Sequence, residues 1–281
     1  MNGYERNTMP LIAQEENLIS LTNIRCTGSH TSQSLPFIMT RADSLNPNRG
    51  YNEQSFITLF KKAGYSTSWI ANQDIGSSYA YFAHEPDTLI HVNSLRSLYS
   101  YDLWLDTDVI KPFADWRVKT NDYPALTIIH SIGSHWWYKS HYSSDDAVYK
   151  PELTSKELSV LEKEQIINSY DNTIIATDRF LKALIDIVRN DNVIIIYISD
   201  HGEALGEDGI WLHGTDCAIL HDVACLVWYS NVYETYFPEK IKALKQKASV
   251  QGSSDDLFYS IIDAGGLRTD VLIPEKSVFY E

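Results

Sequence analysis

The stretch Val193–Gly214 reads VIIIYISDHGEALGEDGIWLHG and guides the interpretation of the whole chain. Its first six residues, Val193 to Ile198, are all apolar or aromatic. A run of this kind, bounded by Asn192 and Ser199, is typical of a strand buried on both faces in the centre of a parallel sheet. Polar residues follow at the predicted carboxyl end of this strand. In open α/β sheets, ligands bind outside the carboxyl ends of the strands.

Asp200 and His201 occupy that strand end, where a carboxylate and an imidazole side by side can face one metal ion. An Asp-His pair in a loop is more often a turn residue beside a solvated imidazole. Here the pair ends an all-apolar strand and is followed by Gly202, Glu203 and a second histidine, His213. This context favours a metal-binding segment over an ordinary turn.

The composition excludes several classes of protein. The 281 residues suit one large domain or two small ones, and we expect a single domain over 1–281. With 44% hydrophobic and 12% aromatic residues, the chain can build a full core. The formal charge of -14 argues against nucleic acid as a partner. Three cysteines are too few for a disulfide framework, and no stretch approaches the ~20 apolar residues of a membrane span.

Strand and helix patterns alternate along the chain. Strands are predicted at Asn17–Ile24, Tyr65–Ala71, Thr88–Val92, Ala125–Ser131, Val193–Ser199 and Asp222–Trp228. Helices are predicted from Ser34–Pro36 onward, at Ser55–Ala63, partly over Tyr101–Trp116, at Leu158–Arg189 and at Asp255–Ala264. Such alternation implies an α/β fold with a mostly parallel central sheet and helices on both faces.

Hydroxyl side chains gather in the loop Cys26–Gln33, just before a predicted helix. A hydroxyl there can be both metal ligand and nucleophile, because a cation lowers its pKa and the helix dipole favours an anion. Serine and threonine are also the preferred N-cap residues, so the loop taken alone is most simply a helix cap. A second polar segment, His130–His135, follows the strand at Ala125 and can reach the same cleft as His201.

Several segments together resemble the catalytic domain of the phosphoethanolamine transferases that modify lipid A and related glycolipids. This family belongs to the alkaline phosphatase and sulfatase superfamily. The resemblance rests on NGYERNTMP at Asn2–Pro10, TSQSLP at Thr31–Pro36, SWIANQ at Ser68–Gln73, HSIGSH at His130–His135, YDNT at Tyr170–Thr173, SDHGE at Ser199–Glu203 and LHG at Leu212–Gly214. It covers nearly the whole chain and implies an alkaline phosphatase/sulfatase-like sandwich.

The resemblance implies a role for each matched residue at the first metal. Thr31, five residues before Pro36, would be the nucleophile that attacks phosphatidylethanolamine and carries a phosphoethanolamine ester. Asp200 and His201 would bind a zinc ion together with the Thr31 oxygen. The reaction would transfer phosphoethanolamine to a cell-envelope glycolipid, either lipid A or the lipopolysaccharide core.

Three more residues would complete the site. His135 and His213 would contact a second zinc ion or the substrate phosphate, and Glu203 would support the site from behind the ligands. One or two zinc ions are therefore expected, although another divalent metal would fit. The expected partners are the phosphatidylethanolamine donor, the glycolipid acceptor and a membrane reached through an N-terminal domain. The protein itself is expected to be monomeric.

One departure from the family pattern qualifies this expectation. The family carries a metal-binding Glu in an E-[ST]-x-R strand before the NGYER segment, whereas this sequence starts at Met1. We therefore expect a soluble domain, truncated at its N-terminus, from an enzyme on the periplasmic face of the bacterial inner membrane. The alternatives are another superfamily phosphotransferase or phosphodiesterase, such as a phosphoglycerol transferase, and a non-catalytic remnant. The C/S-x-P-x-R signature of true sulfatases is missing from the Thr31 loop, which disfavours sulfate hydrolysis.

Overall fold

The computed structural model describes residues 3–76, 79–97, 100–121 and 123–281. Met1 and Asn2, the latter the first residue of the Asn2–Pro10 segment, lie outside this range. The main strands are β1 (Leu18–Ser20), β3 (Ser66–Ala71), β4 (Thr88–His91), β5 (Ala125–His130), β6 (Ile194–Ile198) and β9 (Cys225–Tyr229); β2 (Ile24–Arg25), β7 (Ala204–Leu205), β8 (Trp211–Leu212) and β10 (Gly252–Ser253) have two residues each. The helices are α1 (Thr31–Met39), α2 (Arg49–Asn52), α3 (Phe56–Lys62), α4 (Ala80–Ala83), α5 (Ile110–Lys119), α6 (Lys163–Val188), α7 (Asn231–Tyr236), α8 (Pro238–Lys247) and α9 (Leu257–Ala264).

Two three-stranded sheets form the middle layer of the molecule. In the first, β3 lies between β4 and β5 and runs parallel to both, with Trp69 opposite Leu89 and Ile128. In the second, β9 lies between β1 and β6 and runs antiparallel to both. The short strands form a parallel β2–β10 pair and an antiparallel β7–β8 pair.

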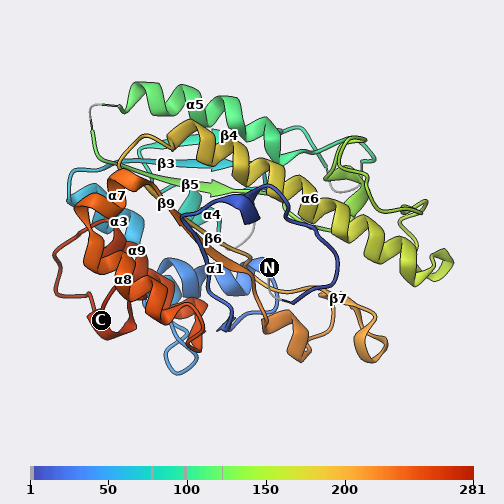
Figure 1. Cartoon of the computed structure of the whole chain (residues 1–281). Helices are drawn as coiled ribbons and strands as arrows, with labels where there is room; N and C mark the ends of the chain where they lie inside the picture. Colours follow the sequence, from blue (N-terminus) through green and yellow to red (C-terminus); the bar gives the residue numbers. More distant parts are fainter. Residues whose placement is uncertain (1–2, 77–78, 98–99, 122) are drawn as a thin grey trace.

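Helices cover both faces of this layer (Figure 1), as the sequence predicts. Alternate side chains of β3 show the reason: Trp69 and Ala71 pack in a core with α1, α3 and α9, whereas Ile70 packs in another core with α5 and α6. The two-residue period of a strand points successive side chains to opposite faces. Because β3 carries apolar side chains on both of its faces, each face must be covered by a layer of helices.

The prediction of a mostly parallel sheet is correct for β4-β3-β5 and wrong for β9. The chain between β6 and β9 holds only the β7–β8 hairpin and 3₁₀ turns, not a helix. A parallel connection needs a crossover of a dozen or more residues, usually helical, to bring the chain back to the same end of the sheet. Without one, the chain re-enters at the end where β6 stops, and β9 runs back alongside it.

The start of the first helix also differs from the prediction. The sequence places it near Ser34–Pro36 on the basis of proline in a first turn, but α1 begins at Thr31 and Pro36 is its sixth residue. Pro36 thus lies inside the helix, where its missing N–H costs one backbone hydrogen bond. The earlier start matters because it makes Thr31 the first residue of the helix.

The N-terminal segment runs along α6 and is fixed to it by polar contacts. Tyr4 donates to the carboxylate of Asp171 at 2.9 Å, and the backbone N–H groups of Leu11 and Ile12 both donate to Asp178 at 2.8 Å. Burial raises the pKa of the Asp178 carboxyl above its ordinary value. Among the described residues, no helix is both long enough and apolar enough to cross a membrane.

Candidate active site

The N-terminus of α1 presents Thr31 to a large cavity at the carboxyl ends of β5 and β6. The preceding residue, His30, is extended, with φ −156° and ψ 160°. The loop can approach the helix this closely because residue 28 is glycine: a Cβ on Gly28 would lie 2.5 Å from the Ser34 hydroxyl oxygen. A helix N-terminus favours negative charge, so an ionised hydroxyl or a phosphate is stabilised beside Thr31.

Asp200 and His201 follow β6 and line the same cavity. The backbone N–H of His201 donates to the Asp200 carboxylate at 3.1 Å, and Nδ1 of the His201 ring lies 2.7 Å from the carbonyl oxygen of Gly202. A carbonyl only accepts, so Nδ1 carries the proton and Nε2 keeps its lone pair. Gly202 is required here, since a Cβ would lie 2.2 Å from the carbonyl oxygen of Ile219.

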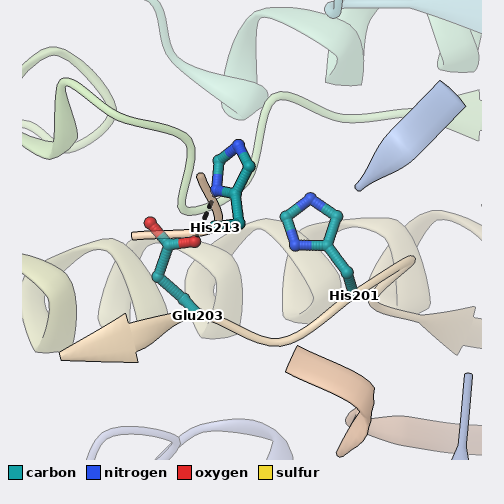
Figure 2. Close-up of side chains that lie close together, drawn as sticks. All are labelled: His201, Glu203 and His213. Atoms are coloured by element: carbon teal, nitrogen blue, oxygen red, sulfur yellow. Dashed lines mark hydrogen bonds and ion pairs between the residues drawn. The ribbon is translucent and has the colours of Figure 1, made fainter. Parts of the chain in front are cut away.

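Glu203 and His213 are in direct polar contact in this site (Figure 2). Nδ1 of His213 lies 2.6 Å from one oxygen of Glu203, and the hydroxyl of Tyr138 donates to the other oxygen at 2.6 Å. The pairing of Ala204 with Leu212 in the β7–β8 hairpin brings residues 203 and 213 side by side. Both oxygens of this buried carboxylate are thus engaged, and His213 presents Nε2 to the cavity.

The surroundings shift the pKa values of His213 and His135 in opposite directions. The hydrogen bond with Glu203 raises the pKa of His213, because a neighbouring carboxylate stabilises the imidazolium. Burial lowers the pKa of His135, whose Nδ1 lies 2.5 Å from the carbonyl oxygen of Trp136. The ring centroids of His213 lie 4.6 Å from His201 and 5.9 Å from His135. The shifts have opposite signs, so His213 is the stronger base of the two.

Sequence reasoning missed two residues of this site. Tyr138 completes the hydrogen bonding of Glu203, but no pattern around it marks this contact. His130 was part of the His130–His135 segment without a role; its ring packs edge-on against Trp69 and Tyr79, and burial lowers its pKa to about 4. Within the described residues its Nδ1 has no hydrogen-bond partner. A histidine directly at the end of an apolar strand was the available signal.

All six residues singled out in the sequence line this one cavity, which has a volume of about 1110 Å³: Thr31, His135, Asp200, His201, Glu203 and His213. Of these, ligand atoms of His201, Glu203 and His213 lie within 4.8 Å of one another. Imidazole nitrogen and carboxylate oxygen are ligands that zinc accepts. The imidazole nitrogens of His201 and His213 therefore fit a zinc ion in this cavity, whereas both oxygens of Glu203 are already engaged by Tyr138 and His213.

The chain was compared with known proteins. A family model described as Sulfatase matches residues 1–267. Phosphoethanolamine transferase EptA of Escherichia coli K12 is 26% identical over 284 residues, which cover 96% of this chain and 51% of the relative. Kdo(2)-lipid A phosphoethanolamine 7''-transferase of the same strain is 31% identical over 242 residues, covering 82% of this chain and 42% of the relative.

A solved structure resembles the chain over almost its full length. The C-terminal periplasmic domain of EptC from Escherichia coli, in complex with Zn, superimposes with a TM-score of 0.82 at 25% identity. The match covers 99% of this chain and 81% of that domain. The chain spans about half the length of the curated relatives it matches. The family match over 1–267 and these likenesses agree: the chain belongs to the sulfatase family of the alkaline phosphatase superfamily.

Proposed function

We propose that the chain is the catalytic domain of an enzyme that transfers phosphoethanolamine from phosphatidylethanolamine to a cell-envelope glycolipid, lipid A or the lipopolysaccharide core. One observation carries the proposal. A hydroxyl at a helix N-terminus, Thr31, lines the same cavity as the strand-end pair Asp200 and His201 and the two histidines His135 and His213. The names of the relatives, which are phosphoethanolamine transferases, support this substrate class.

The first zinc ion would be held by Thr31, Asp200 and His201. When bound, zinc supplies positive charge that neutralises phosphate and lowers the pKa of a hydroxyl ligand. His201 is prepared for this role, since the Gly202 carbonyl holds the proton on Nδ1 and leaves Nε2 as the donor. Glu203 is better suited to orient His213 than to bind metal, because both of its oxygens already accept hydrogen bonds.

The chemistry of the chain's own residues follows from this arrangement. Thr31 Oγ1 gives its proton to solvent and forms a bond to phosphorus as the bond from phosphorus to the diacylglycerol oxygen breaks. The leaving oxygen takes a proton from solvent, and the phosphoethanolamine stays on Thr31. An acceptor hydroxyl then loses its proton and attacks the same phosphorus, and the bond to Thr31 Oγ1 breaks as this oxygen is protonated again. His213, with its pKa raised by Glu203, can donate a hydrogen bond to a phosphate oxygen, or contact a second zinc ion together with His135. The covalent intermediate divides one hard step into two easier ones.

The place of action follows from the relatives rather than from the fold. The solved EptC domain is a periplasmic domain, and we propose that this chain likewise works at the periplasmic face of an inner membrane. The donor lipid and the acceptor would then be presented by the membrane surface, with the α1 end of the cavity turned toward them. A monomer suffices for this reaction, since the six proposed site residues come from one chain.

The test is to trap the intermediate. Zinc-loaded protein is incubated with a short-chain, water-soluble phosphatidylethanolamine, and the intact mass is measured before the acceptor is added. We expect the mass to rise by one phosphoethanolamine group, and peptide mapping to place it on Thr31. A matched incubation with a short-chain phosphatidylglycerol separates this reaction from phosphoglycerol transfer. An adduct from phosphatidylglycerol alone, or on a hydroxyl other than Thr31, would contradict the proposal.

A further inference from the structure

The carboxylate of Asp106 contacts the loop that carries His135. Asp106 begins the short 3₁₀ turn Asp106–Val109, which leads into α5. One of its carboxylate oxygens accepts the backbone N–H of Ile132 at 2.8 Å, and the other accepts the N–H of Gly133 at 2.9 Å. These two residues lie between the end of β5 and His135. The carboxylate therefore holds the chain where it passes from the strand into the candidate site.

The shape of this loop suits a carboxylate rather than an amide. Gly133 has the left-handed backbone, with φ 57°, and successive N–H groups in such a turn form a concavity that binds an anion. The side-chain NH2 group of Asn72 also donates to Asp106, at 2.8 Å. Three donors thus converge on two oxygens. An NH2 group in place of either oxygen would set one donor against another.

Asn72 holds the carboxylate from the end of the neighbouring strand, β3. Its side chain is fully buried, and its Oδ1 accepts from Nδ2 of Asn93 at 2.7 Å. Its backbone N–H donates to the carbonyl oxygen of His130 at 2.8 Å. The ends of β3 and β5 are thereby tied to each other and to Asp106. These contacts give a structural role to the SWIANQ segment at Ser68–Gln73, which supplies this amide.

A second anchor of the loop lies directly before His135. The hydroxyl oxygens of Ser134 and Thr173 are 2.6 Å apart. The Thr173 hydroxyl donates to the carbonyl oxygen of Tyr170 at 2.6 Å, so Ser134 is the donor in the contact between the two hydroxyls. The loop is thus held to the 3₁₀ turn at one point and to α6 at the next, and the His135 ring follows at once.

We propose that Asp106 is a positioning residue: its carboxylate, held by Asn72, sets the course of the loop at Ile132 and Gly133 and thereby the place of the His135 imidazole. This inference rests on the proposed function, in which His135 contacts the substrate phosphate or a second zinc ion. Asp106 acts on the loop, and only through the loop on the chemistry. A displacement of about 1 Å caused by a residue away from the reacting atoms can cost on the order of 10²-fold in rate.

The experiment compares Asp106→Asn with a matched control, Asp178→Asn. Asp178 is a fully buried carboxylate that also accepts two successive backbone N–H groups, those of Leu11 and Ile12, each at 2.8 Å. The control therefore removes the same kind of interaction at a place that does not lead to His135. Each variant is nearly isosteric with the original residue, so both test the loss of an acceptor rather than of packing.

Three quantities are measured on the zinc-loaded protein: amide hydrogen exchange, the NMR signals of the His135 ring, and the rate of adduct formation on Thr31 from a short-chain phosphatidylethanolamine. We expect Asp106→Asn to speed exchange at Ile132 and Gly133 by roughly tenfold or more and to shift the His135 signals. Adduct formation should slow by roughly 10–100-fold per folded molecule.

The control should behave differently at each step. Asp178→Asn should speed exchange at Leu11 and Ile12 and leave the His135 signals and the rate of adduct formation per folded molecule unchanged. If Asp106→Asn does not fold, Asn72→Ala takes its place, because it keeps the carboxylate and removes one of its donors. The same changes should then appear at smaller size.

Two outcomes would overturn the proposal. Unchanged exchange at Ile132 and Gly133 would show that the carboxylate does not hold the loop. Faster exchange there, with the His135 signals and adduct rate of the control, would make Asp106 a purely structural residue. A failure of the proposed function looks different: the original protein would then form no adduct, and the exchange rates and the His135 signals would still decide the role of Asp106.

Discussion

Glu203 and His213 are joined by a contact of 2.6 Å between a carboxylate oxygen and Nδ1, and Tyr138 occupies the second carboxylate oxygen. This relationship fixes which nitrogen of His213 faces the cavity and raises the pKa of its imidazole. The pair lies at the base of the β7–β8 hairpin, so the geometry of the hairpin and the protonation of the histidine depend on each other.

Replacing Glu203 with glutamine should therefore separate the protonation of His213 from the geometry of the hairpin. We expect Glu203→Gln to lower the pKa of His213 toward its ordinary value, because the neutral amide no longer stabilises the imidazolium. Turnover should fall about 10–100-fold, the usual cost of losing a group that orients a functional histidine. Histidine titration by NMR checks the first result. Glu207→Gln changes an exposed carboxylate of the same loop and is the control. It should change neither the pKa of His213 nor turnover. A His213 that titrates as before in the Glu203 variant would contradict this prediction.

Metal binding should depend on Asp200. We expect Asp200→Ala to weaken zinc binding by on the order of 100-fold or more, since loss of a direct ligand should cost at least as much as loss of its supporting partners. Elemental analysis of purified protein and competition with a chromogenic chelator measure the effect. Asp216→Ala removes an exposed carboxylate that contacts His221 and should leave the zinc content unchanged. Undiminished zinc in the Asp200 variant would remove Asp200 from the metal site.

Transfer should depend on the hydroxyl of residue 31. We expect Thr31→Ala to reduce turnover by on the order of 10³-fold or more and to abolish the covalent adduct, because no oxygen remains to attack phosphorus. Thr31→Ser keeps the oxygen and should retain measurable activity. Ser32→Ala, at the next position of α1, is the matched control. If Thr31→Ala still turned over at the original rate, the nucleophile would be another group.

The ion pair between Glu15 and Arg189 predicts a pH dependence of stability. Two hydrogen bonds from Arg189, at 2.7 and 2.8 Å, hold the pKa of the Glu15 carboxyl below its ordinary value. A depressed carboxyl pKa contributes stability above its unfolded value of about 4.3, and the contribution disappears as the pH falls through the folded pKa. Glu15→Gln should therefore destabilise the protein by about 1 kcal/mol at pH 7, because the guanidinium is 40% exposed and partly screened.

The measurement is urea unfolding at pH 7 and at pH 3. The difference between the original protein and Glu15→Gln should be present at pH 7 and should shrink at pH 3. Glu16→Gln, an exposed neighbour, provides the baseline for removing one negative charge from this segment. A difference that is equal at both pH values would show that the effect of Glu15 is packing rather than charge.

Much of the strand framework follows from local patterns. Six predicted strands overlap β1, β3, β4, β5, β6 and β9, because each is an apolar run bounded by polar or turn residues. The relation between strands does not follow from such patterns. β9 has the composition of a buried parallel strand, yet it is antiparallel, since the chain returns through a hairpin rather than a helix.

The residues of the candidate site were also accessible from the sequence, because polar side chains directly after apolar strands mark the carboxyl edge of a sheet. Asp200, His201 and the segment His130–His135 were found in this way, whereas only the family resemblance singled out Thr31 among the hydroxyls of its loop. Tyr138 was not, since its contact with Glu203 spans 65 positions and no local signal marks it.

The sequence by itself determined where the main strands lie and which polar residues stand at their ends, because these depend on periodicity and on neighbours along the chain. Only the tertiary structure decided that Glu203 holds His213, that α1 starts at Thr31, and that β9 runs antiparallel to β6. These features depend on the positions of residues far apart in the chain. An apolar run such as Ile194–Ile198 shows that a strand must be covered, but only the fold shows which strand pairs with it and in which direction.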